Sequence, residues 1–182
     1  VRVLRETYPY IPIVGIEPAV KPAAQNHRGE KVAVMATPLT LHEEKFKQLV
    51  KRYEDQAVII PVPCPDLVEY VEKGILEGPE LEGYLKDVLT PCLQEGVKAV
   101  VLGCTHFPLV KSAIGKVVGE SVRIYDGGEG TARQAKCLLA AKNLCTDQEK
   151  GHICFESSAP EKEAYYEALY RKAAHIDSRV KL

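Results

Sequence analysis

The chain has 182 residues, which is enough to bury the core of one domain or of one domain with an extension. Its 24 basic and 25 acidic residues leave a formal net charge of −1, which argues against nucleic acid or an anionic membrane as a partner. A small neutral or anionic ligand fits this charge balance better. No apolar run approaches the roughly 20 residues of a membrane-spanning helix, which predicts a soluble chain.

Six cysteines are spread widely along the chain, and no two form a Cys-x-x-Cys pair. In a small secreted domain an even number would indicate disulfides, but the normal apolar content of this chain requires no such crosslinks. The spacing also fits no zinc knuckle, so no metal site is expected. We therefore expect a cytoplasmic protein with free thiols, most of them packed as small hydrophobic side chains.

Strand and helix patterns alternate along the chain. Continuous apolar runs predict four buried strands, at residues 31–36, 57–62, 98–102 and 122–125. Apolar periodicity and helix-capping residues predict five helices, at residues 41–53, 67–73, 79–94, 108–118 and 131–144. Such alternation specifies parallel strands joined by right-handed crossovers, which is an α/β parallel-sheet three-layer sandwich. The unbroken apolarity of the strands agrees, because strands covered on both faces have no polar side.

The ends of the helices and of the chain carry further signals. Asp66 is a candidate N-cap for the helix at 67–73, and Gly74 a candidate end for it. Residues 1–8 have the pattern of a helix already in progress. After residue 143 the pattern weakens, with a candidate strand at residues 153–155 and a terminal helix at residues 160–173.

Ligands of an open parallel sheet bind beyond the carboxyl ends of its strands. The predicted strand ends present Thr37 and Thr40, Cys64, residues 103–106, and Asp126. The third of these places Cys104, Thr105 and His106 on a loop directly before a helix. Exposed N–H groups and the positive helix end there favour a bound carboxylate and a thiolate, which suits acid–base chemistry by sulfur.

Each candidate also has an ordinary structural reading. A cysteine at the end of a buried strand is usually a core residue, and packing is the better reading for Cys64, which lies between two prolines. The other readings are a helix cap for Thr105, turn and N-cap residues for Thr37 and Thr40, a solvated helix face for Glu72, a turn for Asp126 and a surface side chain for His106. Spacing alone does not decide between the functional and the structural readings of these residues.

Four segments resemble, in order, motifs of the glutamate racemases. Residues 14–23 (VGIEPAVKPA) resemble the signature G-I-E-P-A-x-K-P-A, and residues 102–109 (LGCTHFPL) resemble the second catalytic segment of that family. Residues 35–40 (MATPLT) and 64–72 (CPDLVEYVE) are similar to its A-T-x-x-T and C-P-x-x-V-x-x-V-E segments. The likeness extends over residues 10–135.

The resemblance implies a cofactor-independent bacterial enzyme that interconverts L- and D-glutamate and supplies D-glutamate for peptidoglycan. It implies two pseudosymmetric α/β domains, each with a cysteine that takes or gives the Cα proton. A thiol suits both roles, because its ordinary pKa of about 8.5 can be tuned towards neutrality. Carried over by motif, Cys104 would be one of the two bases, and His106 would assist it or orient the ligand. Thr105 would contact a substrate carboxylate. The second domain's part of the pocket would include Thr37, Thr40 and Glu72.

The chain departs from the family at its beginning. The Asp-Ser-Gly and Cys-Asn-Thr segments of the first domain are not in the sequence, so a fragment with one catalytic cysteine is expected. Residues 1–15 would then be the end of an N-terminal half-domain and a linker, residues 16–125 a complete second domain, and residues 126–182 a segment returning to the first domain. Residues 126–128 read Asp-Gly-Gly where the family commonly has Asp-Ser-Gly. An open sheet edge would favour pairing with another copy, so a homodimer is one option.

Two other functions remain open. The chain could act without turnover, as a glutamate-binding or protein-binding module. It could also racemise another substrate, because aspartate and hydantoin racemases share the logic of two cysteines. The Glu-Pro-Ala and Cys-Thr-His-Phe-Pro motifs favour glutamate as the substrate.

Overall fold

The structure, a computed structural model, describes residues 1–146 and 152–179. The chain divides into two compact units: unit 1 consists of Val1–Glu17 with Gly127–Cys154, and unit 2 of Pro18–Asp126 with Phe155–Leu182. Over the described ranges, no helix is both long enough and apolar enough to cross a membrane. The predicted domain organisation, with residues 126–182 returning to the first domain, stays a prediction.

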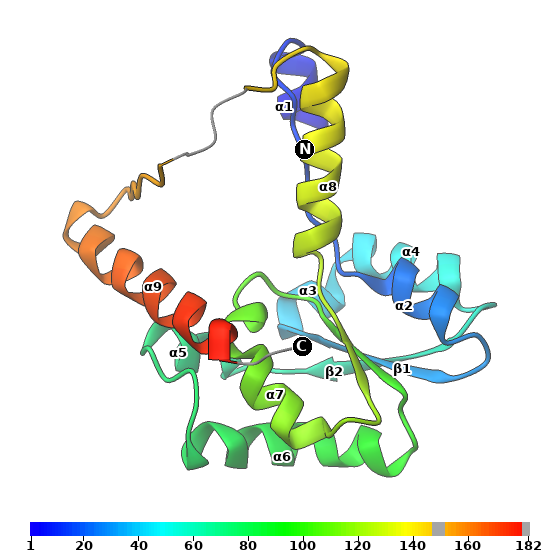
Figure 1. The fold of residues 1–182 in the computed structure, drawn as a ribbon. Coiled ribbons are helices and arrows are strands. Elements are labelled where there is room, and N and C mark those ends of the chain that lie inside the picture. Colours follow the sequence, from blue (N-terminus) through cyan, green and yellow to red (C-terminus); the bar gives the residue numbers. More distant parts are fainter. Residues whose placement is uncertain (147–151, 180–182) are drawn as a thin grey trace. The chain divides into compact units, whose positions relative to one another are not determined.

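Unit 2 is built on a parallel four-stranded sheet of order β2-β1-β3-β4 (Figure 1). Its strands are β1 (Lys31–Ala36), β2 (Val58–Pro63), β3 (Ala99–Leu102) and β4 (Arg123–Tyr125). Met35 lies opposite both Val62 of β2 and Leu102 of β3, so these three strands end nearly level. All four predicted strands are confirmed, each boundary to within one residue.

Helices cover both faces of this sheet (Figure 1). One face packs on α2 (Val20–Asn26) and α4 (Glu44–Tyr53), and the other on α5 (Leu67–Glu72), α6 (Pro79–Gln94) and α7 (Lys111–Val118). Successive β1 residues alternate between the two cores, with Val32 and Val34 in the first and Ala33 and Met35 in the second. Because both sides of β1 are buried, the three-layer α/β sandwich is confirmed.

Two predicted helices are divided in the structure. The helix expected at residues 41–53 is α3 (Pro38–His42) followed by α4, with Glu43 extended between them at φ −64° and ψ 138°. It starts early because Thr37 caps α3, with Pro38 in the first turn, where a proline costs no hydrogen bond. The helix expected at residues 108–118 begins as a 3-10 turn, Phe107–Val110, before α7. Helix α2 was not predicted.

The ends of α5 were predicted at Asp66 and Gly74. Gly74 follows the C-cap at φ +71°, and the Gly74 and Ile75 N–H groups donate to the carbonyls of Val71 and Tyr70, each at 2.9 Å. This is a Schellman motif, and it confirms the predicted end. Asp66 does hold the N-cap position, but its side chain makes no capping hydrogen bond.

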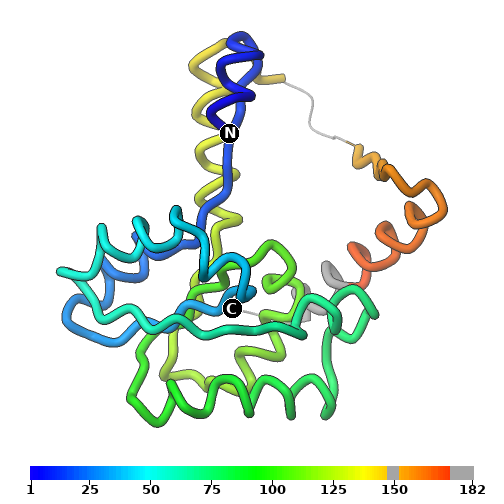
Figure 2. The backbone as a smooth tube through the Cα atoms, turned by 180° about the vertical axis from the view of Figure 1, so that it is seen from behind, coloured from blue at the N-terminus to red at the C-terminus, as the bar shows by residue number. Residues whose placement is uncertain are grey.

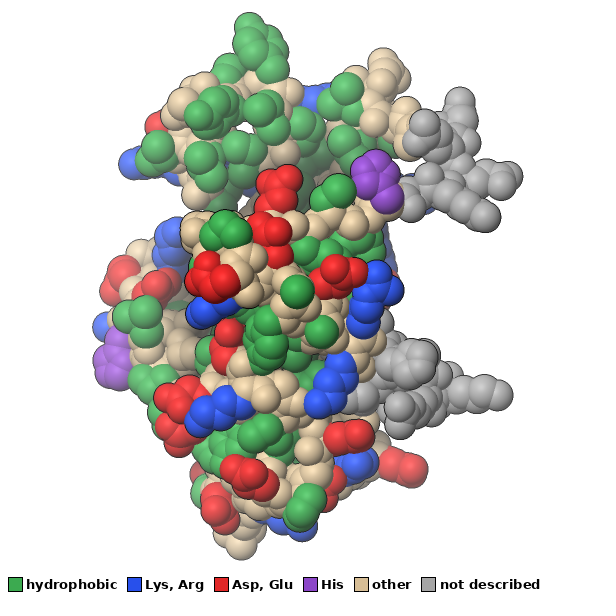
Figure 3. Space-filling view, turned by 90° about the vertical axis from the view of Figure 1, so that its left-hand side faces the viewer, with side chains coloured by type: hydrophobic (Ala, Val, Ile, Leu, Met, Phe, Trp, Pro, Cys, Tyr) green, Lys and Arg blue, Asp and Glu red, His purple; other side chains and the backbone are tan. Residues whose placement is uncertain are grey.

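Unit 1 contains α1 (Arg2–Thr7) and α8 (Gly128–Ala141), which lie side by side in Figures 1 and 2. The Lys142 ammonium donates to the carbonyls of Pro9 and Tyr10 at 3.5 and 3.3 Å. None of the described residues of unit 1 is buried, and hydrophobic side chains gather over α1 and α8 in Figure 3. Helix α8 begins three residues before its predicted start, and the hydroxyl of Thr131 in its first turn donates to the Gly127 carbonyl.

The last described helix is α9 (Glu163–Arg179), which follows a 3-10 turn at Pro160–Lys162. The terminal helix predicted at residues 160–173 is therefore confirmed and is longer than expected. The candidate strand at residues 153–155 is wrong, since these residues have no regular structure and Ile153 is 62 % exposed. A strand requires a partner ladder, and in the part that the structure describes no strand pairs with this segment.

Candidate active site

The carboxyl ends of β2, β1 and β3 meet at one edge of the sheet. The Cys64 N–H donates to the Ala36 carbonyl at 2.9 Å, and the Gly103 N–H donates to the Met35 carbonyl at 2.7 Å. These bonds continue the ladder one step past the strands. They bring the loops that carry Thr37 and Cys104 beside each other, as expected for a ligand site in this kind of sheet.

Three of the predicted residues form a chain of polar contacts. The Cys104 Sγ lies 3.8 Å from His106 Nδ1, and His106 Nε2 lies 2.9 Å from Glu72 Oε1. The His106 and Glu72 side chains are about one-third exposed, at 32 % and 38 %. The contact joins α5 to the loop after β3, although Glu72 and His106 are 34 residues apart in sequence.

The contact with Glu72 assigns the tautomer of His106. A carboxylate has no proton to donate, so Nε2 carries the hydrogen and donates it to Glu72. In a neutral imidazole, Nδ1 is then an acceptor, and it faces the Cys104 thiol. The arrangement can withdraw the thiol proton and hold it on an imidazole paired with a carboxylate, as in other nucleophile–histidine–carboxylate sites.

The two threonines predicted after β1, Thr37 and Thr40, contact each other. Thr37 Oγ1 lies 3.0 Å from Thr40 Oγ1 and accepts the Thr40 N–H at 3.3 Å, so Thr37 acts as the N-cap of α3. The loop residue Thr105 is exposed. Over the described residues, no hydrogen bond links any of these threonines to Cys104, His106 or Glu72. The structure therefore unites three of the six predicted residues by direct contact. It places Thr105 on the loop after β3, Thr37 at the end of β1, and Thr40 within α3.

The environment of the Cys64 thiol does not suit a second catalytic base. Its side chain is fully buried, its Sγ lies 3.5 Å from the Val62 carbonyl, and burial, with a smaller contribution from Cys92, raises the pKa of its thiol to about 12. A thiol with that pKa stays protonated at neutral pH. The packing interpretation of Cys64 is the one that the structure supports.

Two residues of α9 reach the same region without having been predicted. The Tyr165 hydroxyl donates to the Glu72 carbonyl, and the Lys172 ammonium donates to the Gly74 carbonyl at 2.6 Å. The sequence carries only a general signal for this contact, namely the spacing of Tyr165, Leu169 and Lys172 on one helical face.

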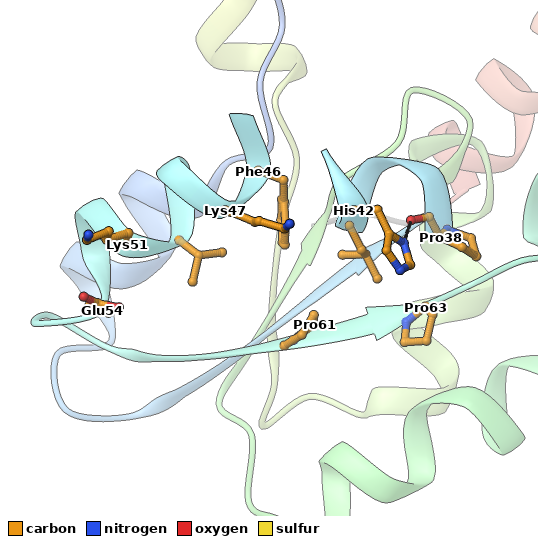
Figure 4. A pocket seen from close by; sticks show the side chains of 10 residues that line it. Pro38, His42, Phe46, Lys47, Lys51, Glu54, Pro61 and Pro63 are labelled. Carbon is orange, nitrogen blue, oxygen red and sulfur yellow. Dashed lines mark hydrogen bonds between the residues drawn. The ribbon is translucent and has the colours of Figure 1, made fainter. Parts of the chain in front are cut away.

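A hollow of about 560 Å³ lies elsewhere in unit 2, between β2 and the helices α3 and α4. Figure 4 shows Phe46, Lys47 and Lys51 on its helical side and Pro61 and Pro63 on its strand side. It contains none of the predicted site residues. It lies against the core that α4 covers, whereas Cys104 packs against the core of α5, α6 and α7.

The described side chains include no group of three or more His, Cys, Asp or Glu residues arranged to hold a metal ion. The contacts of the candidate site join a thiol, an imidazole and a carboxylate, which are groups able to move a proton.

Two bacterial proteins that are similar to this chain are glutamate racemases. A glutamate racemase of Clostridium perfringens is 45 % identical over 160 residues, covering 87 % of this chain and 62 % of that protein. A glutamate racemase of Clostridium kluyveri is 48 % identical over 148 residues, covering 81 % of this chain and 57 % of its own. The chain thus spans less than two thirds of the length of these relatives.

A solved structure agrees with the sequence relatives. Escherichia coli glutamate racemase, in complex with L-glutamate and the activator UDP-MurNAc-Ala, superimposes with a TM-score of 0.77 at 30 % identity, covering 94 % of this chain and 65 % of that one. The family model of the Asp/Glu/hydantoin racemases matches residues 1–135, which include the whole Cys104–His106–Glu72 chain. This protein belongs to the Asp/Glu/hydantoin racemase family.

Proposed function

We propose that this chain supplies the Cys104 side of a glutamate racemase active site. The observation that carries the proposal is the contact chain from Glu72 through His106 to Cys104 at the carboxyl end of β3. The names of the Clostridium relatives and of the Escherichia coli structure support glutamate as the substrate. Because the protein is similar to those enzymes over part of their length, the substrate remains part of the proposal.

In the proposed reaction the Cys104 thiolate removes the α-hydrogen of glutamate as a proton and becomes a thiol. The electron pair left on Cα is delocalised into the substrate carboxylate. A second acid on the opposite face donates its proton to Cα, which inverts the configuration and leaves that group as the base for the reverse reaction. His106 accepts the Cys104 proton when the thiolate is generated, and Glu72 stabilises the resulting imidazolium.

The threonines and the helix after Cys104 are proposed to hold the substrate. Thr105 is exposed and adjoins Cys104 in sequence, and Thr37 and Thr40 lie at the start of α3, where their hydroxyls contact each other. Hydroxyl and backbone N–H donors of this kind suit the two carboxylates of glutamate. No cofactor is part of the proposal, since a thiol pair suffices to move one proton on each face.

The second cysteine is proposed to come from residues outside this chain. Unit 1, over its described residues, has no buried side chain, and the family relatives are longer than this chain. Added residues that cover α1 and α8 would give that unit a core. We further propose that the complete protein acts in the bacterial cytoplasm, supplies D-glutamate for peptidoglycan, and pairs as a homodimer.

Hydrogen exchange at Cα tests this proposal. The chain is incubated in deuterated water with either enantiomer of glutamate, and the α-proton signal is followed by NMR. We expect slow exchange of one enantiomer without racemisation, because one base serves one face of Cα. Cys104→Ser should abolish the exchange, whereas Cys137→Ser, which alters an exposed thiol of α8, should not. Full racemisation by the chain would contradict the assignment of a single base.

The alternative is a glutamate-binding module without turnover. It is distinguished by the same experiment combined with alkylation of Cys104 by iodoacetamide. Protection of Cys104 by glutamate without any α-hydrogen exchange would favour the module and refute catalysis. Exchange by the wild-type chain refutes the module.

A further inference from the structure

Helix α9 lies against the end of α5 that carries Glu72 (Figure 1). Tyr165, Leu169 and Lys172 are spaced i, i+4 and i+7, so they lie on one face of α9. Leu169 is 8 % exposed and belongs to the same hydrophobic core as Val71 of α5. The two polar residues flank this buried anchor and both donate to carbonyls at the end of α5.

These donors complete the capping of α5. The last four carbonyls of a helix have no partner within it. In α5 the Schellman motif satisfies the carbonyls of Tyr70 and Val71, and the next one, that of Glu72, accepts from the Tyr165 hydroxyl. The Lys172 ammonium on the Gly74 carbonyl adds a positive charge where the helix dipole is negative.

The same residue that receives this cap makes the contact with His106. Helix α5 has six residues, so its last turn is held by few hydrogen bonds of its own. Fixing the Glu72 backbone restricts where its carboxylate can reach, and that carboxylate lies 2.9 Å from His106 Nε2. A shift of the last turn of α5 would lengthen this bond first and loosen the His106 contact with Cys104 next.

We propose that α9 is the positioning element of the Cys104 site, with Tyr165 as the positioning residue that holds Glu72 against His106. The proposal rests on the proposed function only in taking Cys104 as the acid–base group. It assigns a role to residues 163–172, which lie outside the segment matched by the family model. Contact with the substrate is not part of this role.

The Tyr165 hydroxyl is in the protonation state that this positioning role requires. Partial desolvation and, second, the Glu72 carboxylate raise the pKa of Tyr165, so the hydroxyl keeps its proton at neutral pH. A protonated hydroxyl is what the Glu72 carbonyl requires, because a carbonyl only accepts. Tyr165→Phe removes this donor and leaves the ring, which makes an edge-to-face contact with Tyr166 at 5.6 Å between centroids.

The test is the pH dependence of Cys104 alkylation by iodoacetamide in the 182-residue chain, followed by mass spectrometry of the Cys104 peptide. Wild type is compared with Tyr165→Phe, Glu72→Gln and the double variant. Tyr170→Phe is the matched control, since it makes the same change on the same helix, where Tyr170 packs on Phe155 instead. Circular dichroism verifies folding, and Lys172→Met replaces Tyr165→Phe if the latter loses structure.

We expect Tyr165→Phe to slow alkylation at neutral pH by about twofold to tenfold, the effect of one weakened hydrogen bond. Its rate should lie between wild type and Glu72→Gln, and the double variant should be no slower than Glu72→Gln alone, because both changes act through one contact. Tyr170→Phe should match wild type. A Tyr165→Phe profile identical to wild type, or additive losses in the double variant, would overturn the proposal.

The proposed function is judged separately in the same samples. Adding D- or L-glutamate should protect Cys104 of the wild-type chain from alkylation. If glutamate gives no protection while Tyr165→Phe still changes the profile, the positioning role stands and glutamate recognition fails. If glutamate protects Cys104 and Tyr165→Phe has no effect on its alkylation, glutamate recognition stands and the positioning role fails.

Discussion

Gly103 and Met35 approach so closely that a Cβ atom on residue 103 would lie 2.7 Å from the Met35 carbonyl oxygen. The same carbonyl accepts the Gly103 N–H, so neither backbone segment can move away without losing the bond that aligns the ends of β1 and β3. Cys104 follows directly. The position of the proposed base thus depends on the absence of a side chain at residue 103.

Gly103→Ala should therefore destabilise the protein by about 1–3 kcal/mol, the usual cost of forcing an extra carbon into a packed site. It should also alter the rate of Cys104 alkylation. Urea denaturation measures the first effect. Gly83→Ala is the control, because a Cβ there meets nothing within 4 Å and alanine favours the helix by about 1 kcal/mol. Equal stability of Gly103→Ala and wild type would show that the ends of β1 and β3 adjust freely.

The tautomer of His106 should depend on Glu72. In the wild type we expect the ring hydrogen on Nε2, and in Glu72→Gln a mixture, because an amide can donate to Nε2 as well as accept from it. Two-bond ¹⁵N–¹H correlation spectra of the imidazole distinguish the two forms. Glu69→Gln on the same helix is the control, since Glu69 pairs with Lys73 at 3.3 Å. Unchanged ring shifts in Glu72→Gln would contradict the assigned hydrogen bond.

Leu85→Ala should lower the free energy of unfolding by about 2–5 kcal/mol, the range for deleting a buried leucine side chain. Leu85 is fully buried in α6, against the face of the sheet that carries Met35 and Leu102. The neighbouring Lys86 is exposed, so Lys86→Ala should change stability by less than about 0.5 kcal/mol. Chemical denaturation monitored by circular dichroism makes the comparison, and a loss below about 1 kcal/mol for Leu85→Ala would disagree with the packing described.

Stability should fall as pH rises above 9, in part through Cys64. The ordinary thiol pKa of about 8.5 applies to the unfolded chain, and burial raises the pKa in the folded protein to about 12. At neutral pH and below, both states hold the proton and Cys64 contributes no pH dependence. Between pH 9 and about 12 the unfolded state releases it first, so the folded state binds more protons and loses stability as pH rises.

Cys64→Ala tests that contribution. The variant should be less stable than wild type at pH 7, because it leaves space in the core, but its stability should fall less steeply between pH 9 and pH 11. Tyr84 still titrates in the variant, since burial likewise raises the pKa of its phenol to about 12. Parallel pH profiles for wild type and Cys64→Ala would rule out the buried neutral thiol.

Much of the sheet could be predicted because its signals are local. Strands covered on both faces are continuously apolar, so residues 31–36 and 98–102 stand out without reference to any partner. Gly74 ends α5 for an equally local reason, its positive φ. The wrong strand at residues 153–155 and the unpredicted break of the helix at Glu43 lie in short segments. The conformation of such segments depends on their tertiary contacts more than on their own sequence.

The sequence by itself determined the α/β class, the order of the elements and, through motif resemblance, the identity of Cys104, His106 and Glu72 as candidates. Only the tertiary structure decided that Glu72 meets His106, that Cys64 is sealed in the core, and that α9 caps α5 through Tyr165. Local patterns record which face of each segment is apolar. Contacts between residues as far apart as Glu72 and Tyr165 depend instead on how the segments pack, which no local pattern encodes.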